Sequence, residues 1–232
     1  MNVKRITLEP AFVLHTRNYR DTSLLVDMLT MEHGRLTVVA RGVRSKKSRL
    51  QGILVPFLPL LISYSGKGDL CTLQRAEIDG ANISFTGDLL VSGFYLNELL
   101  VKLVPRQESY EEVYHAYKKT LSSLINSKLP EVELRLFEKC LLKNLGYGLE
   151  LDRTVSGEGV LENKCYAFEF GVGINQVDSS CPGNFSGKSL LALHKNILIA
   201  KEEITDAKRL LRKVLAILLG GKTLKSREMF YK

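Results

Sequence analysis

The sequence predicts an α+β protein, in which a small five-stranded β-barrel in residues 1–80 precedes an α-helical domain in residues 81–232. Two observations lead to this fold class. The first eighty residues contain short apolar runs typical of strands, and from about residue 86 the apolar spacing becomes helical. The 232 residues are 45% hydrophobic, which is enough to build a core in one large or two small domains and excludes a disordered tail protein.

Five segments of the first eighty residues predict strands, because they are rich in β-branched, aromatic or leucine residues and are separated by turn residues. They cover residues 11–17, 22–30, 35–41, 57–64 and 70–78. Within the third segment, Leu36, Val38 and Ala40 alternate with polar positions. The period of two therefore places Arg35 and Arg41 on the face directed away from the core.

Helical spacing predicts three consecutive helices and a strong fourth near the C-terminus. The first begins near residue 86, the second covers about 110–125, and the last spans about 205–219 after weaker spacing at 190–193. The third should begin with Pro130 in its first turn and stop at Gly146. Residues 152–187 lose the pattern and are rich in Gly, Ser and Asn, which predicts a small irregular or β insertion with a strand at 165–170.

Positive charge is concentrated at both ends of the chain. Lys and Arg total 33 against 25 Asp and Glu, a net charge of +8, and residues 1–80, 81–206 and 207–232 carry +5, −4 and +7. No acidic residue lies between Glu32 and Asp69, a stretch with seven basic residues. Such clusters suit the phosphates of nucleic acid, and the alternative is a solvated loop with no partner.

The sequence contains no catalytic or metal-binding motif with the required spacing. The strings at 187–189 and 221–223 lack the earlier glycine of a phosphate-binding loop. The four cysteines form no Cys-x-x-Cys pair and the four histidines are scattered, so the sequence predicts no metal and no cofactor. Whether Cys165 and Cys181 approach each other stays open. These absences favour a binding protein over an enzyme, with a nucleotide-dependent enzyme as the disfavoured alternative.

The cellular setting is predicted from what the chain lacks. Widely spaced cysteines favour a reducing, cytoplasmic compartment over a disulfide scaffold. The basic N-terminus is not followed by an apolar run, and the longest apolar stretch, 53–62, is too short for a bilayer. We therefore expect neither secretion nor a membrane span.

Eight strings of this sequence, taken in order, resemble the RecO recombination mediators of bacteria. They are Ala11–Arg17, Thr22–Leu25, Glu32–Arg35, Ala40–Arg44, Pro56–Leu61, Ser92–Leu100, Leu145–Gly148 and Leu219–Glu228. The last, LGGKTLKSRE, is the most specific, and together they cover about residues 10–230. Many family members hold zinc through four cysteines after the Gly-Tyr-Gly string. No such cysteines follow it here, so the chain resembles the zinc-free branch and residues 152–187 should fold by packing alone.

The resemblance implies an OB-fold in the N-terminal barrel and a function without catalysis. Proteins of this family bind single- and double-stranded DNA and anneal complementary strands. With RecR, and in many bacteria RecF, they load RecA onto strands coated by single-strand binding protein, whose acidic C-terminal tail they bind. A nucleoid-associated cytoplasmic protein is implied. The alternative is an adaptor that links single-strand binding protein to RecR and binds DNA only weakly.

The DNA-binding residues expected from basic clusters and aromatic platforms are numerous. They are Arg17, Tyr19, Arg20, Arg35, Arg41, Arg44, Lys46, Lys47, Arg49, Lys208, Arg212, Lys222, Lys225 and Arg227. Tyr19 either stacks on a base or packs in a turn, and Arg17 or Arg20 could instead pair with Asp21 or Asp27. The Gly-Gly-Lys string at 220–222 could contact DNA, cap the last helix, or do both.

A tail-binding site is expected on the third helix. The tail needs an apolar pocket and a cation for its terminal carboxylate. Arg135 is the candidate cation because its Leu-Arg-x-Phe-Glu string matches the family, and Leu134 and Leu141 are candidate pocket walls. The alternative makes Arg135 a solvated residue on the helix face.

Overall fold

The computed structural model describes residues 4–45, 48, 50, 52–67, 70–81, 83–178 and 183–226. The chain forms two compact units. Unit 1 comprises residues 1–126 and 224–232, and unit 2 comprises residues 127–223. The compact units thus divide after residue 126, whereas the sequence places a domain boundary after residue 80.

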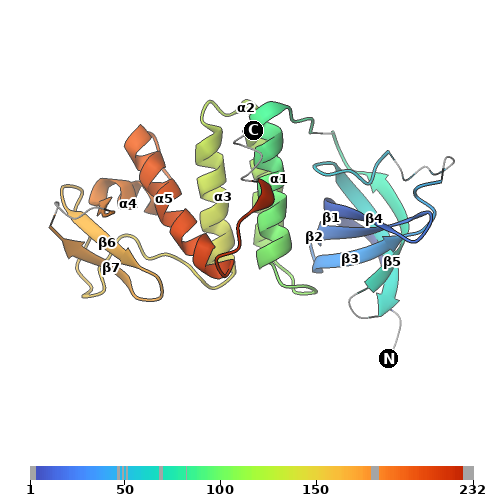
Figure 1. The fold of residues 1–232 in the computed structure, drawn as a ribbon, viewed down its shortest axis with the longest axis horizontal. Coiled ribbons are helices and arrows are strands. Elements are labelled where there is room, and N and C mark those ends of the chain that lie inside the picture. The colour runs from blue at the N-terminus through green and yellow to red at the C-terminus, as the bar shows by residue number, and fades with distance from the viewer. Residues whose placement is uncertain are drawn as a thin grey trace. The chain divides into compact units, whose positions relative to one another are not determined.

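The first five strands close into a barrel (Figure 1). They are β1 (Lys4–Tyr19), β2 (Ser23–Thr30), β3 (Gly34–Ala40), β4 (Pro59–Lys67) and β5 (Leu70–Ile78). The order around the barrel is β1-β2-β3-β5-β4, and β3 and β5 run parallel while the other neighbours are antiparallel. The predicted barrel is confirmed, and a closed five-stranded barrel is the architecture of an OB-fold. β1 begins earlier than predicted, because residues 4–6 pair with residues 64–66 of β4.

The barrel encloses a core made by the inward positions of its strands. Val13, Val26, Val38, Leu60 and Ile62 are fully buried there. In the third strand Leu36, Val38 and Ala40 are buried as predicted, but Thr37 and Val39 on the opposite face are buried as well.

Helices α1 (Gly87–Leu103) and α2 (Glu111–Asn126) complete the core of unit 1. The ring of Phe12 lies 5.5 Å from that of Tyr114 and 5.2 Å from that of Tyr117, measured between centroids. The Tyr117 hydroxyl donates to Asn97 Oδ1 at 2.5 Å, and the Asn97 amide donates to the Leu14 carbonyl at 3.0 Å. This shared core explains why the two helices belong to the same compact unit as the barrel.

The chain returns to unit 1 at its C-terminal end. Leu224 is fully buried, and the Glu98 carboxylate of α1 accepts hydrogen bonds from Lys225 N at 3.0 Å, Ser226 N at 2.9 Å and Ser226 Oγ at 2.8 Å. Burial alone would raise the pKa of Glu98, but these hydrogen bonds and one from Lys102 lower it. We call this contact the C-terminal latch.

Unit 2 combines three helices with a small sheet. Its elements are α3 (Pro130–Asn144), β6 (Cys165–Glu169), β7 (Gly173–Val177), β8 (Phe185–Ser186), α4 (Gly187–His194) and α5 (Lys201–Leu218). Pro130 occupies the first turn of α3 as predicted. The irregular insertion is an antiparallel sheet in the order β7-β6-β8, and the strand predicted at 165–170 is confirmed as β6.

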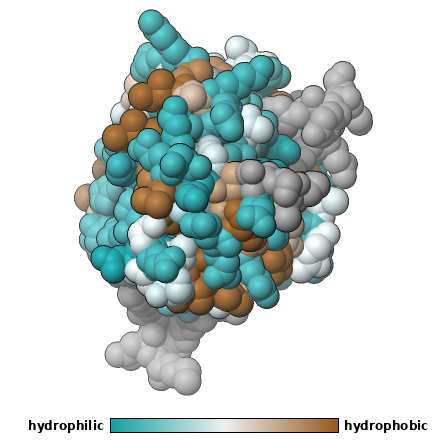
Figure 2. Space-filling view, turned by 90° about the vertical axis from the view of Figure 1, so that its left-hand side faces the viewer, coloured by the Kyte–Doolittle hydropathy of each residue, from teal (hydrophilic) through white to brown (hydrophobic). Residues whose placement is uncertain are grey.

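The small sheet is held by apolar packing. Tyr166, Ile174 and Phe185 are almost fully buried, and the Tyr166 hydroxyl accepts a hydrogen bond from Leu161 N at 2.8 Å. Figure 2 looks onto the end of unit 2 that carries this sheet, where apolar residues are interspersed among hydrophilic ones. No helix in the described ranges is long and apolar enough to cross a membrane.

Candidate nucleic-acid interface

One end of the barrel carries a group of exposed arginines, which we call the arginine rim. Its members come from the end of β1, from the β1–β2 turn and from the turn that follows β3: Arg17, Tyr19, Arg20, Arg41 and Arg44. All four arginines are exposed and Tyr19 is half-buried. Asp21, also exposed, is the acidic residue of the β1–β2 turn, so the rim keeps a net positive charge.

Backbone pairing holds the two turns of the rim together. Tyr19 pairs with Ser23, and Leu24 pairs with Ala40, so Arg41 lies at the next position beyond the β2–β3 ladder. Arg44 N donates to the Thr22 carbonyl at 2.9 Å. The rim is therefore fixed by the barrel itself, although its residues are more than twenty positions apart in the sequence.

Arg20 and Arg44 contact other residues of the rim rather than acidic side chains. The Arg44 guanidinium donates to the Arg20 carbonyl at 3.3 Å, and the Arg20 guanidinium lies 5.2 Å from the centroid of the Tyr19 ring. The latter is a cation–π contact on a partly exposed ring. Within the described part of the chain neither Arg17 nor Arg20 forms an ion pair, so the alternative that pairs them with Asp21 or Asp27 is not supported.

Asp27 has other partners. It accepts a hydrogen bond from Thr37 Oγ1 at 2.5 Å, and its carboxylate lies 3.9 Å from Arg106 and 4.0 Å from His15. Arg106 could not be predicted from the sequence, because its contact with Asp27 of β2 depends on how the turn after α1 folds. This cluster is structural in character, since it ties that turn to the barrel wall.

Arg35 does not join the rim. It lies on β3, six residues before Arg41, which directly follows the strand, so the two are about 20 Å apart along the strand direction. Arg35 Nε donates to the Val104 carbonyl at 2.8 Å. Burial, and next the charge of Arg106, lower the pKa of Arg35. Thr37 and Val39, which lie between Arg35 and Arg41 on the same face of the strand, are buried, so the two arginines do not share a continuous solvent-facing surface.

Several expected DNA-binding residues lie outside the described residues: Lys46, Lys47, Arg49 and Arg227. Of the other C-terminal candidates, Arg212, Lys222 and Lys225 are exposed, while Lys208 forms an ion pair with Glu131 at 3.1 Å. Lys225 belongs to unit 1, whereas the other three belong to unit 2.

The Gly-Gly-Lys string caps α5. Gly220 and Gly221 both have positive φ angles, 61° and 73°, and their N–H groups donate to the carbonyls of residues 217 and 216. Glycine is favoured in this left-handed conformation, which satisfies the last carbonyls of a helix. The predicted capping role is confirmed, and a role in DNA contact stays a prediction.

Arg135 is buried, so the alternative that makes it a solvated residue is wrong. It is 4% exposed and donates through Nη2 to Glu138 Oε1 at 2.5 Å. Its Nε and Nη1 atoms make no hydrogen bond to any described residue. Leu141 is fully buried and Leu134 is 8% exposed. Binding of a peptide at these residues therefore requires movement of side chains around α3, and their role stays a prediction.

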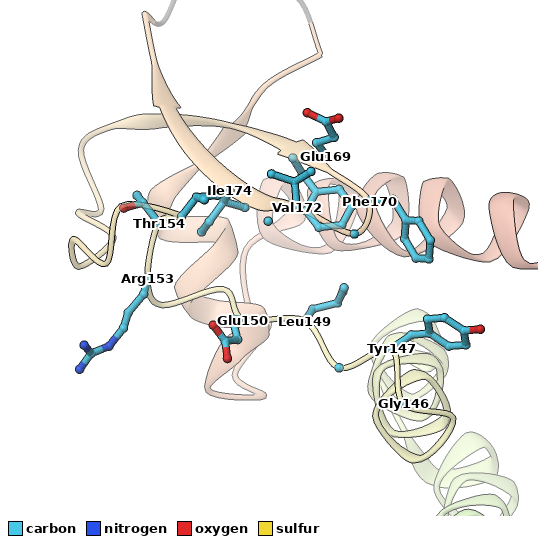
Figure 3. Close-up of a pocket in the computed structure, with 15 residues that line it drawn as sticks. Gly146, Tyr147, Leu149, Glu150, Arg153, Thr154, Glu169, Phe170, Val172 and Ile174 are labelled. Atoms are coloured by element: carbon cyan, nitrogen blue, oxygen red, sulfur yellow. The ribbon is translucent and has the colours of Figure 1, made fainter.

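A separate pocket of about 360 Å³ lies in unit 2 between the segment after α3 and the β6–β7 turn (Figure 3). Tyr147 and Phe170 lie side by side at one end, with ring centroids 5.9 Å apart, and Arg153 points outward at the other. Glu150 and Glu169 add negative charge around it. None of the residues predicted from the sequence to bind DNA or the tail lines this pocket.

Comparisons with known proteins identify the chain. A family model described as the N-terminal domain of recombination protein O matches residues 3–81, and the model of its C-terminal domain matches residues 85–228. A DNA repair protein RecO from Coxiella burnetii is 43% identical over 230 residues, which are 98% of this chain and 99% of that protein. The Nitrosococcus oceani protein of the same name is 42% identical over 96% of this chain and 92% of its own length. The one from Paraburkholderia xenovorans is 38% identical over 97% of this chain and 76% of its own length.

An OB-fold barrel with an exposed basic end, followed by a helical region, defines a class of proteins that carry their binding surface on the barrel. The two family models cover almost the whole chain between them, and their boundary falls between β5 and α1. The chain belongs to the RecO family of DNA repair proteins. Its role therefore lies in DNA repair and recombination.

Proposed function

We propose that this protein is a recombination mediator that binds single- and double-stranded DNA and anneals complementary strands. It acts without catalysis and, with RecR and RecF, helps to load RecA onto nucleoid DNA coated by single-strand binding protein. The observation that carries this proposal is the arginine rim of the barrel, in a chain that belongs to the RecO family.

The rim suits a single strand for two physical reasons. Four exposed guanidinium groups at the end of β1 and on two adjoining turns can neutralise successive phosphates of one backbone. Tyr19 keeps part of its ring exposed beside Arg20, and base–aromatic stacking contributes about 1–3 kcal/mol per base. This combination favours a DNA binder over a protein adaptor, because an adaptor needs neither feature at the end of the barrel.

The salt dependence of binding tests the rim. Each neutralised phosphate of a single strand contributes about 0.7 to the slope of log K against log salt. Replacing Arg17, Arg20, Arg41 and Arg44 by alanine should therefore reduce this slope by up to about 3. A matched variant in which the exposed Lys118, Lys119, Lys195 and Lys201 become alanine removes the same charge and should keep most of the slope. Equal slopes in the two variants would reject the rim as the DNA site, and a flat slope in the parent protein would favour the adaptor.

The tail-binding part of the proposal rests on Arg135. Two of its nitrogens, Nε and Nη1, are buried without a hydrogen bond to the described residues, and a carboxylate is their natural acceptor. Removing one partner of a buried ion pair typically costs about 3–5 kcal/mol, so Arg135→Ala is a poor test. Arg135→Lys keeps the charge and the pairing with Glu138 but cannot offer the planar pair of donors.

Annealing of oligonucleotides coated with the cognate single-strand binding protein separates the two roles. We expect the parent protein to anneal coated strands quickly without ATP, and to lose this advantage when the tail of the coat is deleted. Arg135→Lys should reproduce that loss on coated strands and leave annealing of naked strands unchanged. Failure of the parent protein to anneal even naked strands would overturn the annealing role.

A further inference from the structure

A β-bulge in β1 directs the acidic side chain of Glu9 into the interior of unit 1. The pairing register of β1 with β4 shifts between Ile6 and Glu9, and Leu8 has a φ of 54°. Bulges commonly re-aim a side chain in this way. As a result Glu9 is only 3% exposed. A buried carboxylate is costly unless its environment compensates its charge, so the groups around it are informative.

The β2–β3 turn supplies those groups. Glu32 N donates to Glu9 Oε1 at 2.7 Å, and His33 Nδ1 lies 3.3 Å from Glu9 Oε2. His33 Nδ1 is buried, yet the geometry of a hydrogen bond to any described residue is not met. A ring nitrogen thus faces a carboxylate oxygen at the distance of an ion pair, which a protonated imidazole would form, but without the geometry of a hydrogen bond.

That separation is the one expected between two ligands of the same metal ion. Zinc binds imidazole nitrogen and carboxylate oxygen at about 2.0–2.2 Å, and a tetrahedral arrangement then places the two ligand atoms about 3.4 Å apart. The carboxylate of Glu32 is exposed, and ligand atoms of Glu9, Glu32 and His33 all lie within 4.8 Å of one another. A rotation of the Glu32 side chain can bring a third ligand to the same point.

We propose that Glu9, Glu32 and His33 form a binding site for a divalent cation of the zinc class, with water in the fourth position. The backbone positions the ligands in advance, since Thr30 Oγ1 donates to the Gly34 carbonyl at 2.8 Å and Met31 N donates to the Pro10 carbonyl at 3.0 Å. Two carboxylates and a neutral imidazole balance the charge of the ion. The bound ion would fasten the β2–β3 turn to β1, independently of any role in DNA binding.

Zinc titration of the full-length protein, first stripped of metal by a chelator, tests this site. The informative variant is Glu32→Gln, because the hydrogen bond from Glu32 to Glu9 comes from the backbone N–H, which the substitution keeps. We expect one tight zinc site in the parent protein, and at least tenfold weaker binding in Glu32→Gln and in His33→Gln. The matched control Glu112→Gln, at an exposed position of α2, should bind as the parent does.

Two further readouts keep the outcome unambiguous. Zinc at one concentration should raise the thermal midpoint of the parent protein and of Glu112→Gln more than that of Glu32→Gln. Cobalt in place of zinc should give an absorption spectrum without a thiolate charge-transfer band, because the proposed site contains no cysteine. Equal zinc affinity in the parent and Glu32→Gln, a thiolate band, or no zinc binding would each overturn the proposal.

Discussion

The C-terminal latch predicts a specific effect of replacing Glu98 by glutamine. The carboxylate receives three hydrogen bonds from Lys225 and Ser226, two of them on Oε2, and the Lys102 ammonium lies 3.3 Å from Oε1. Glutamine keeps one acceptor oxygen. Its NH₂ group replaces the other oxygen and faces the N–H and O–H donors that bonded to that oxygen. The substitution therefore removes the negative charge and at least one pair of contacts.

The expected loss of stability follows from these contacts. A hydrogen bond to a charged group contributes about 1.5–3 kcal/mol, and partial exposure of Glu98 reduces that figure. We expect Glu98→Gln to lower the free energy of unfolding by about 2–3 kcal/mol. For a chain of this size the thermal midpoint should fall by roughly 4–12 °C. Hydrogen exchange should also accelerate at residues 224–226.

The pH dependence of this loss identifies its cause. The folded-state pKa of Glu98 is lowered, so its contribution to stability is fully present above the unfolded pKa of about 4.3 and is lost as pH falls through the folded value. Thermal unfolding followed by circular dichroism should show a constant gap between parent and variant near neutral pH. The gap should close as the solution becomes more acidic than about pH 4.

A control and a contrary outcome complete the test. Glu162→Gln changes an exposed carboxylate with no such contacts and should unfold like the parent protein at every pH. If Glu98→Gln unfolds at the parent temperature, the latch contributes nothing. If the gap is the same at pH 7 and at acid pH, steric disturbance rather than the lost charge is responsible.

Two other substitutions test the packing that supports the site. Tyr117→Phe removes the hydroxyl that donates to Asn97 and leaves a buried amide oxygen without that donor. It should lower the free energy of unfolding in urea by about 1–3 kcal/mol. The control Tyr147→Phe, at an exposed position, should change this free energy little. A cost within error for Tyr117→Phe would show that water replaces the hydroxyl. Gly34→Ala combines a φ of 65° with a new Cβ only 1.7 Å from the Glu108 carbonyl oxygen, so its soluble yield and thermal midpoint should both fall sharply. Parent-like behaviour of Gly34→Ala would mean that the turn after α1 is free to move.

Much of the fold could be predicted because it depends on local patterns. The helical spacing of α5 predicts its buried face directly, and the period of two in β3 predicts the residues that enter the barrel core. Pro130 and Gly220 mark a helix start and a helix end for stereochemical reasons that act within a few residues. Each of these features can be predicted from residues that are close together in the sequence.

The candidate site was harder to predict because it depends on contacts between distant residues. The sequence pattern predicts both Arg35 and Arg41 as DNA-binding residues. In the structure they lie far apart along the barrel wall, and Arg35 bonds to the Val104 carbonyl. Arg135 stands on a helix whose sequence does not reveal how deeply each face is buried. His33 looked like an ordinary turn residue, since only the bulge before Glu9 brings a carboxylate to it.

The C-terminal latch also sets the order in which the protein can be completed during synthesis. Residues 1–126 leave the ribosome first, but Leu224 and Ser226 of the same compact unit follow only after the whole of residues 127–223. At about 5–20 residues per second, that interval lasts roughly 5–20 s. During this interval the part of α1 around Glu98 is not covered by residues 224–226. A nascent chain arrested before residue 224 should therefore present this surface of α1 to chaperones, which the finished protein covers.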